Sequence, residues 1–292
     1  MKPYNAVKSI LEIIENNLDN KFCINCLAYE TGISAIHLQR VFSAAFHTPL
    51  AKYIRLRKLS ASLNTLAFSD CRVIDIANQL GFEHEQSYIA AFKAEFNITP
   101  KQYRLKCPII KTTPPFTMDD FFSTSDGMLS VPDIVIIPEI CLVGELNHIT
   151  VAESIEKAPR AAKAFWENGR HTIKNAVNKN VYIGLTRMNE ARDASTYLSA
   201  LQTSDIKRVP KGLSADRLPP SEYIRFFYIG QHHPYNLDRN VMCEMYSAIE
   251  NYIKGNTKYN IDRSIFFERI DELETGEGYC YLEWLTPISL KL

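Results

Sequence analysis

Residues 27–53 read LAYETGISAIHLQRVFSAAFHTPLAKY and residues 76–103 read IANQLGFEHEQSYIAAFKAEFNITPKQY, so that one pattern occurs twice in the chain. Each copy has an apolar residue and an alanine, a glycine four residues after the alanine, two phenylalanines four residues apart, and a proline. The alanine lets a second helix cross closely, the glycine permits a tight turn with positive φ, and the phenylalanines share one helix face. The proline marks a helix boundary. The repeat therefore predicts two helix-turn-helix units with one connecting helix between them.

The rest of residues 1–107 is predicted to be helical as well. The opening helix has one apolar stripe at helical spacing, formed by Val7, Ile10, Leu11, Ile14 and Leu18. Ser34 can cap the helix that follows it, and Pro49 suits the first turn of a long connecting helix that ends near Phe68. Further helices are predicted at about residues 25–30, 73–80 and 84–96.

Composition and charge describe an ordinary globular chain with a modestly basic first third. The 292 residues are 46% hydrophobic, which suits two domains. Residues 1–107 carry 13 lysines and arginines against 9 acidic residues, and such an excess suits a polyanionic partner. No run approaches the roughly 18 apolar residues of a membrane span, and no signal peptide is recognisable. The seven cysteines lie without a disulfide framework, so we expect a cytoplasmic protein with no membrane partner.

Beyond residue 107 the pattern changes twice. Residues 108–130 are rich in proline, serine and threonine, and we expect a linker there. Residues 131–292 show the order strand, helix, strand, strand twice, and the first helix, at 152–177, is expected to break near Pro159. The predicted fold class is multidomain, with an all-α double helix-turn-helix domain at 1–107 and an α+β domain of two such repeats at 131–292. Two similar halves would share a central crevice.

The first domain resembles the DNA-binding domain of AraC/XylS-type regulators. The resemblance covers residues 5–106, and it is carried by residues 32–42 and 49–59, by Gly81-Phe82 and by Thr99-Pro100. With the DNA-binding part first and a larger domain after it, the layout is similar to that of Rob-type members. The resemblance implies a sequence-specific transcription regulator, acting as an activator, with double-stranded DNA and RNA polymerase as its partners.

The resemblance also implies that the second helix of each unit enters a major groove of DNA. On the first of these helices the outward residues are Ile36, Gln39 and Arg40. An apolar side chain can touch a thymine methyl group, glutamine can pair with adenine, and arginine can pair with guanine. We therefore expect this helix to carry most of the base recognition.

On the second of these helices the matching face holds Glu85, Gln86, Ala90 and Lys93. Family members commonly carry an arginine where Ala90 stands, so we expect weaker base recognition by the second unit.

Basic residues outside the two helices are candidates for phosphate contacts, which position a protein without reading sequence. Each of them could equally be a solvated charge. These candidates are Arg55 and Arg57, together with Lys52, Lys58, Arg72, Lys101 and Arg104.

The second domain resembles the gyrase-inhibitor-like, SOUL-related effector-binding fold. The resemblance is carried by residues 221–226, 266–269 and 281–288. It implies a crevice for an amphipathic, often cationic compound, because an aromatic wall and a buried carboxylate together favour such a ligand. The candidate ligand-binding residues are Tyr182, Phe226, Tyr228, Glu268, Glu283 and Trp284. The aromatic residues could equally be strand core, and strand alternation could turn either glutamate to solvent.

Other possible sites lack the partner residues that a redox, metal or catalytic role would need. Cys23 and Cys26 have CxxC spacing but no second pair or histidine near them, so we expect a packing role before a redox role. His232 and His233 lie in a predicted loop without further metal ligands. There is no phosphate-binding glycine loop and no nucleophile elbow. We therefore expect no cofactor, no metal and no catalytic residues.

Three classes of function share the DNA-binding half. The leading interpretation is a regulator that responds to a small-molecule effector or a protein partner bound at the second domain. The second is a hydrolase of small electrophiles that uses Glu268 or Glu283 in the crevice. The third is a protein-interaction module in which the second domain holds no small molecule.

Overall fold

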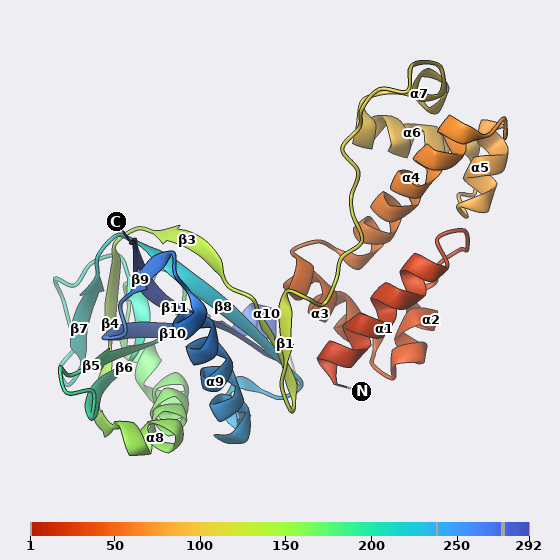
Figure 1. Cartoon of the computed structure of the whole chain (residues 1–292). Coiled ribbons are helices and arrows are strands. Elements are labelled where there is room, and N and C mark those ends of the chain that lie inside the picture. The colour runs from red at the N-terminus through yellow and green to blue at the C-terminus, as the bar shows by residue number, and fades with distance from the viewer. Residues whose placement is uncertain (1, 238, 276–277, 292) are drawn as a thin grey trace. The chain divides into compact units, whose positions relative to one another are not determined.

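The computed structural model describes residues 2–237, 239–275 and 278–291 (Figure 1). The chain divides into two compact units, residues 3–119 and residues 120–292. The first unit is helical, and the second is an antiparallel sheet with helices. The predicted fold class, an all-α domain followed by an α+β domain, is confirmed.

The first unit contains the two predicted helix-turn-helix units. Its helices are α1 (Pro3–Asn16), α2 (Ile24–Thr31), α3 (Ala35–Phe46), α4 (Leu50–Phe68), α5 (Val73–Gln79), α6 (Glu85–Phe96) and α7 (Pro100–Lys106). The helix pair α2 and α3 forms the first unit, α5 and α6 form the second, and α4 connects them (Figure 1).

The repeated residues do what the pattern predicts. Gly32 and Gly81 make the tight turns with φ of 66° and 73°, a region that favours glycine. Ser34 caps α3 by accepting a hydrogen bond from the His37 backbone N–H at 3.3 Å. Phe42 and Phe92, the first phenylalanine of each copy, are fully buried. Local sequence therefore fixes both turns and the inner face of each second helix.

The segment predicted as a linker, residues 108–130, is divided between the two units. Residues 108–119 belong to the helical unit, where the Phe116 ring stacks on Tyr53 and Phe46 with centroid distances of 4.4 and 4.6 Å. The Phe116 backbone N–H also donates to the Tyr53 hydroxyl at 3.1 Å. Residues 121–130 instead form the first two strands of the second unit. Aromatic packing and strand pairing thus give this proline-rich segment defined partners.

The second unit is built on one antiparallel sheet, which has 11 strands among the described residues. The strands are β1 (Phe121–Ser123), β2 (Gly127–Ser130), β3 (Asp133–Ile137), β4 (Ile140–Thr150), β5 (Val181–Met188), β6 (Ala194–Thr203), β7 (Ser214–Leu218), β8 (Ser221–Gly230), β9 (Tyr259–Ile261), β10 (Ile265–Asp271) and β11 (Cys280–Leu290). Their order is β1-β2-β8-β11-β10-β5-β6-β4-β7, with β3 beside β8 and β9 beside β11.

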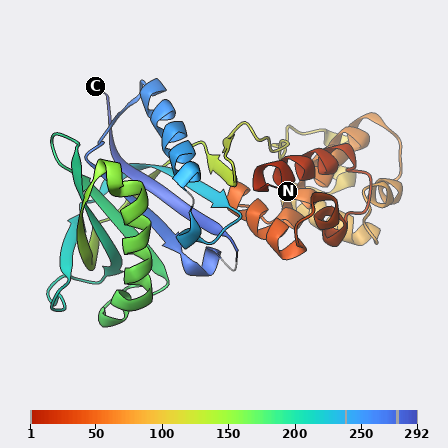
Figure 2. The same ribbon diagram turned by 90° about the horizontal axis from the view of Figure 1, so that it is seen from below.

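Two helices cover one face of this sheet, α8 (Val151–Ala164) and α9 (Arg239–Gly255) (Figures 1 and 2). The segments β4-α8-β5-β6 and β8-α9-β10-β11 are the two predicted repeats of strand, helix, strand, strand. The break expected near Pro159 was wrong, because α8 runs through Pro159 and gives way after Ala164 to a π-helical turn, η1 (Phe165–Gly169). The shorter elements are η2 (Arg170–Thr172), η3 (Pro234–Asn236) and α10 (Glu272–Thr275).

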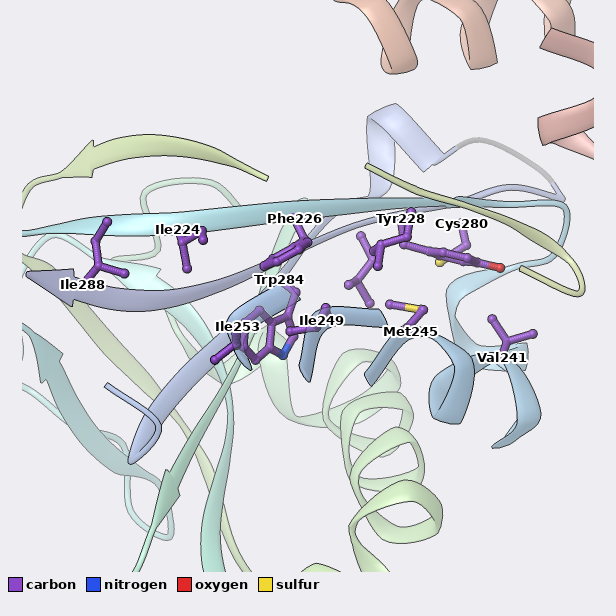
Figure 3. Packing of buried hydrophobic residues seen from close by; sticks show 12 residues of the cluster. Ile224, Phe226, Tyr228, Val241, Met245, Ile249, Ile253, Cys280, Trp284 and Ile288 are labelled. Carbon is purple, nitrogen blue, oxygen red and sulfur yellow. The ribbon is translucent and has the colours of Figure 1, made fainter. Parts of the chain in front are cut away.

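A hydrophobic cluster joins α9 to the sheet. Phe226 on β8 and Trp284 on β11 point towards Ile249 and Ile253 on α9 (Figure 3). Phe226 and Trp284 are neighbours in the strand register, and their ring centroids lie 6.0 Å apart. Since successive strand residues face opposite sides, Glu283 must lie on the face away from α9.

Within the described ranges, none of the helices combines the length and the apolar character that crossing a membrane requires.

Candidate functional site

Helix α3 presents one face to solvent and an apolar face to the core. Ile36, Gln39 and Arg40 are exposed, and 67% of the Ile36 surface is accessible. Leu38 and Val41, which alternate with them at helical spacing, are buried. The three predicted base-reading residues therefore lie together on one accessible surface, one helical turn from end to end.

Helix α6 presents a corresponding surface in the second unit. Gln86, Ala90 and Lys93 are exposed at helical spacing, whereas Glu85 is half-buried. The centre of this surface is the methyl group of Ala90, which offers no hydrogen-bond donor. The second surface can therefore make fewer polar contacts with a base edge than the first.

Arg57 and Lys58 are candidates for phosphate contacts, but their charged groups bind partners inside the first unit. The Arg57 guanidinium forms an ion pair with Glu15 of α1, with Nη2 2.6 Å from Oε2, and its side chain is 12% exposed. The buried Lys58 ammonium group donates to the backbone carbonyls of Asn20 and Leu80. These two cations hold elements of the helical unit together. Their charged groups are therefore bound to internal partners and are not available to contact phosphate.

The other predicted phosphate contacts differ in how accessible they are. Arg55, Lys52 and Lys101 are exposed. Arg72 is exposed but pairs with Asp75 at 2.8 Å, and Arg104 donates to the backbone carbonyls of Leu66 and Cys71. Arg55, Lys52 and Lys101 are therefore the candidates that remain accessible to a phosphate.

The second unit contains a cavity of about 470 Å³ between the sheet and its two helices. The lining residues include Ala158, Ala162 and Trp166 of α8 and η1, Met245, Tyr246, Ile249 and Ile253 of α9, and Tyr182, Tyr197, Phe266, Glu268 and Trp284 of the sheet. Phe266 and Trp284 stack with centroids 5.4 Å apart, and Trp166 meets Tyr182 edge-on at 6.2 Å. The walls are therefore mainly apolar and aromatic.

A carboxyl group, Glu268 on β10, projects into this cavity. Tyr197 donates a hydrogen bond to Glu268 Oε1, and the Tyr197 and Tyr182 hydroxyl oxygens lie 2.7 Å apart. Gly184 makes room for this arrangement, because a Cβ there would lie 2.5 Å from both Glu268 Oε1 and the Tyr197 hydroxyl. The strand glycine thus permits a close approach between side chains of its two neighbouring strands.

The charge of Glu268 is not compensated by a neighbouring cation. Among the lining residues that the structure describes, Glu250 pairs with Arg263 and Glu272 with Arg170, whereas Glu268 has no cationic partner. Burial raises the pKa of Glu268 to about 7, although the hydrogen bond from Tyr197 acts in the opposite direction. When Glu268 is ionised, above about pH 7, its carboxylate therefore has no neighbouring cation to neutralise it.

The structure brings half of the predicted ligand-binding residues to the cavity. Tyr182, Glu268 and Trp284 line it. Phe226 and Tyr228 are fully buried in the core cluster and do not line it.

Glu283 differs from the prediction in its position. It lies on the opposite face of the sheet, where it forms ion pairs with Arg225 at 3.0 Å and Arg269 at 2.9 Å. The reason is the two-residue period of β11, which turns Glu283 away from the face that Trp284 occupies. Its carboxylate stabilises the sheet and is not available to a ligand in the cavity.

Comparison with known proteins bears on the helical unit. A family model described as a helix-turn-helix domain matches residues 27–106. The transcriptional activator AarP of Providencia stuartii is 38% identical over 99 residues, which are 34% of this chain and 73% of AarP. The regulatory protein SoxS of Salmonella typhimurium is 32% identical over 104 residues, which are 36% of this chain and 97% of SoxS. The chain belongs to the AraC family of DNA-binding transcription regulators.

The multiple antibiotic resistance protein MarA of Escherichia coli is also similar, with 33% identity over 100 residues, 34% of this chain and 79% of MarA. Each of these relatives matches about a third of the chain, and the family model lies at residues 27–106. The predicted layout, with this domain first and an α+β domain after it, is the one that the structure has.

Some solved structures match just over half of the chain at low identity. The protein SAV2435 bound to tetraphenylphosphonium is 15% identical, covers 54% of this chain and 93% of its own, and has a TM-score of 0.43. An integron cassette protein of Vibrio cholerae is 13% identical, covers 54% and 95%, and has a TM-score of 0.41. Neither likeness assigns a ligand to this AraC-family chain.

Sequence reasoning missed several residues of the cavity. Tyr197 and Trp166 line the cavity but are not among the candidate ligand-binding residues that the sequence suggests. Gly184 in the middle of β5 was a usable signal, because a glycine inside a strand often marks a close approach. Within the described ranges, no group of three or more histidine, cysteine, aspartate or glutamate side chains is placed to hold a metal ion.

Proposed function

We propose that this AraC-family chain is a transcription activator whose second domain binds an amphipathic organic cation and thereby changes the binding of the first domain to DNA. The observation that carries the effector half is the uncompensated Glu268 carboxyl group in a cavity with aromatic walls. A ligand with apolar groups would fill the cavity, and its positive charge would neutralise the carboxylate.

The helical domain would read DNA mainly through α3. Arg40 and Gln39 offer hydrogen bonds to guanine and adenine, and Ile36 offers an apolar contact to a thymine methyl group. The α6 surface, with Glu85, Gln86 and Lys93 around Ala90, would contribute less to base recognition and more to contact with the backbone.

Exposed cations beside these helices would hold the DNA backbone. Arg55 is the leading candidate, and the pairing of Arg57 with Glu15 supports an internal role for Arg57 instead. Charge neutralisation of phosphates would make binding depend steeply on salt.

The remaining features of the proposal concern partners and location. AarP is named a transcriptional activator, which supports activation as the mode of action. An activator of this kind would have RNA polymerase as its partner. Such a regulator would work in the cytoplasm, on double-stranded DNA, without catalysing a reaction.

Selection from random oligonucleotides with the purified full-length chain tests the DNA-reading half of the proposal. We expect an asymmetric motif with a strongly selected block for α3 and a weaker block about one helical turn of DNA away for α6. Titration of the selected site over a salt series should show a steep loss of affinity with rising salt. Failure to enrich any motif, with binding that salt does not change, would exclude this chain as a sequence-specific DNA reader.

A further inference from the structure

Two cysteines lie together at the start of α2, and neither is packed in the core. Cys23 is the N-cap residue of α2 and Cys26 lies in its first turn, and both are exposed. The Cys23 sulfur accepts a hydrogen bond from the Cys26 backbone N–H at 3.4 Å. Their exposure therefore does not agree with the packing role that we expected from the sequence.

The capping position distinguishes the two thiols. Serine, threonine, aspartate and asparagine are the usual N-cap residues, and a neutral sulfur is a weak acceptor in their place. A thiolate is a better cap, because the helix N-terminus favours negative charge. A hydrogen bond from the Cys26 side chain lowers the pKa of Cys23, and the same contact raises the pKa of Cys26. Cys23 is therefore the more readily ionised nucleophile and Cys26 its protonated neighbour.

We propose that Cys23 and Cys26 form a thiol–disulfide exchange site for low-molecular-weight disulfides, with Cys23 as the attacking thiol and Cys26 as the resolving thiol. The Cys23 thiolate attacks one sulfur of the disulfide, whose sulfur–sulfur bond breaks and releases one thiolate. Cys26 then loses its proton to solvent and attacks the Cys23 sulfur, which releases the second thiolate. The protein dithiol loses two electrons, and the small disulfide is reduced to two thiols.

The backbone allows the second step with a local adjustment. Side chains three residues apart on a helix have Cβ atoms about 5–6 Å apart, whereas a disulfide needs about 3.5–4.5 Å. Cys23 stands outside the helix with an extended backbone, φ −111° and ψ 116°, so it can approach Cys26 without breaking the helical ladder. Closure would change the cap that the Cys23 sulfur provides, and with it the first turn of α2.

The site also lies where DNA would approach. In a helix-turn-helix unit the helix before the recognition helix crosses the DNA backbone, and a helix N-terminus attracts phosphate. Here that helix is α2, whose Leu27 and Ala28 are buried beneath α3. A bulky anionic adduct on Cys23 would stand in the path of a phosphate, and bound DNA would shield Cys23. This placement rests on the proposed mode of DNA binding, whereas the exchange chemistry does not.

The chemistry is tested by treating the full-length chain with oxidised glutathione and mapping each cysteine by peptide mass spectrometry. We expect a Cys23–Cys26 disulfide and release of two glutathiones per chain, with Cys23 reacting about tenfold faster than the exposed Cys107 and Cys243. Cys26→Ser should stop at a stable glutathione adduct on Cys23. Cys23→Ser, which keeps a good helix cap, should leave Cys26 reacting no faster than the exposed Cys107 and Cys243. Cys243→Ser should behave as the unchanged chain does.

Equal reaction rates at Cys23, Cys107 and Cys243, or no disulfide between Cys23 and Cys26, would overturn the exchange site. The DNA-facing position is tested separately by repeating the reaction with excess selected DNA. Protection of Cys23 by about tenfold, with Cys243 unchanged, supports that position. An unchanged rate at Cys23 would overturn it while leaving the exchange chemistry intact.

Discussion

Replacing Glu268 with glutamine is expected to weaken the binding of tetraphenylphosphonium, a bulky aromatic cation, by about 30-fold or more at pH 8. The substitution keeps the size of the side chain and removes the charge that lies uncompensated in the cavity. The chain has two tryptophans, Trp166 and Trp284, and both line the cavity, so quenching of tryptophan fluorescence reports binding there. Calorimetric titration gives the same affinity independently.

Glu250→Gln is the matched control for this substitution. It makes the same chemical change at another lining residue, but Glu250 already pairs with Arg263, so its effect on affinity should be small. Equal losses in the two variants would show that the probe responds to the overall charge of the cavity and not to Glu268.

The affinity for tetraphenylphosphonium should also depend on pH, and the pKa of Glu268 decides whether it rises or falls. Because burial raises that pKa to about 7, most Glu268 groups are protonated at pH 6 and most are ionised at pH 8. A cation prefers the ionised form, so affinity should rise by about tenfold from pH 6 to pH 8, with a proton released on binding below pH 7. The Glu268→Gln variant should show a flat profile. A flat profile in the unchanged chain would contradict the role of this carboxylate.

Replacing Arg40 with alanine is expected to weaken binding to the selected DNA site by about 1–3 kcal/mol, or roughly 5- to 150-fold. Arg40 is exposed on α3 beside Gln39 and Ile36. Because its guanidinium would pair with one guanine, the loss should fall on one base pair, and the variant should no longer discriminate there. Affinity measured on a panel of single-base variants of the site gives this directly.

Arg55→Ala is the comparison that separates base reading from backbone contact. A lost phosphate contact should weaken specific and random DNA alike and reduce the salt slope by about 1. If Arg40→Ala instead weakens specific and random DNA equally, then Arg40 holds the backbone and the assignment of α3 as the main base reader is wrong.

The sequence predicted the DNA-binding half well because its signals are local. The glycine turns, the Ser34 cap and the paired phenylalanines each act within one helical unit, and their spacing repeats. Helical period alone also places Ile36, Gln39 and Arg40 on one face. The roles of Arg57 and Lys58 could not be predicted in this way, because their partners Glu15 and Leu80 lie 42 and 22 residues away in sequence.

The second unit was predicted less completely, for a physical reason. Alternation along β11 separates Glu283 from Trp284, but it does not say which face the helices cover. Phe226 is as aromatic as Trp284, yet it lies deeper in the cluster under α9. The Tyr197 contact with Glu268 passes over Gly184 on the intervening strand, and such a contact depends on strand order.

The dissociation constant of the full-length chain for its selected DNA, with and without saturating tetraphenylphosphonium, tests most directly whether the cavity regulates DNA binding. We predict a shift of about fivefold or more, and thermodynamic reciprocity requires DNA to change the affinity for the cation by the same factor. At a cation concentration that leaves Glu268→Gln unbound, that variant should show no shift. Identical DNA affinities with and without bound cation in the unchanged chain would contradict the account.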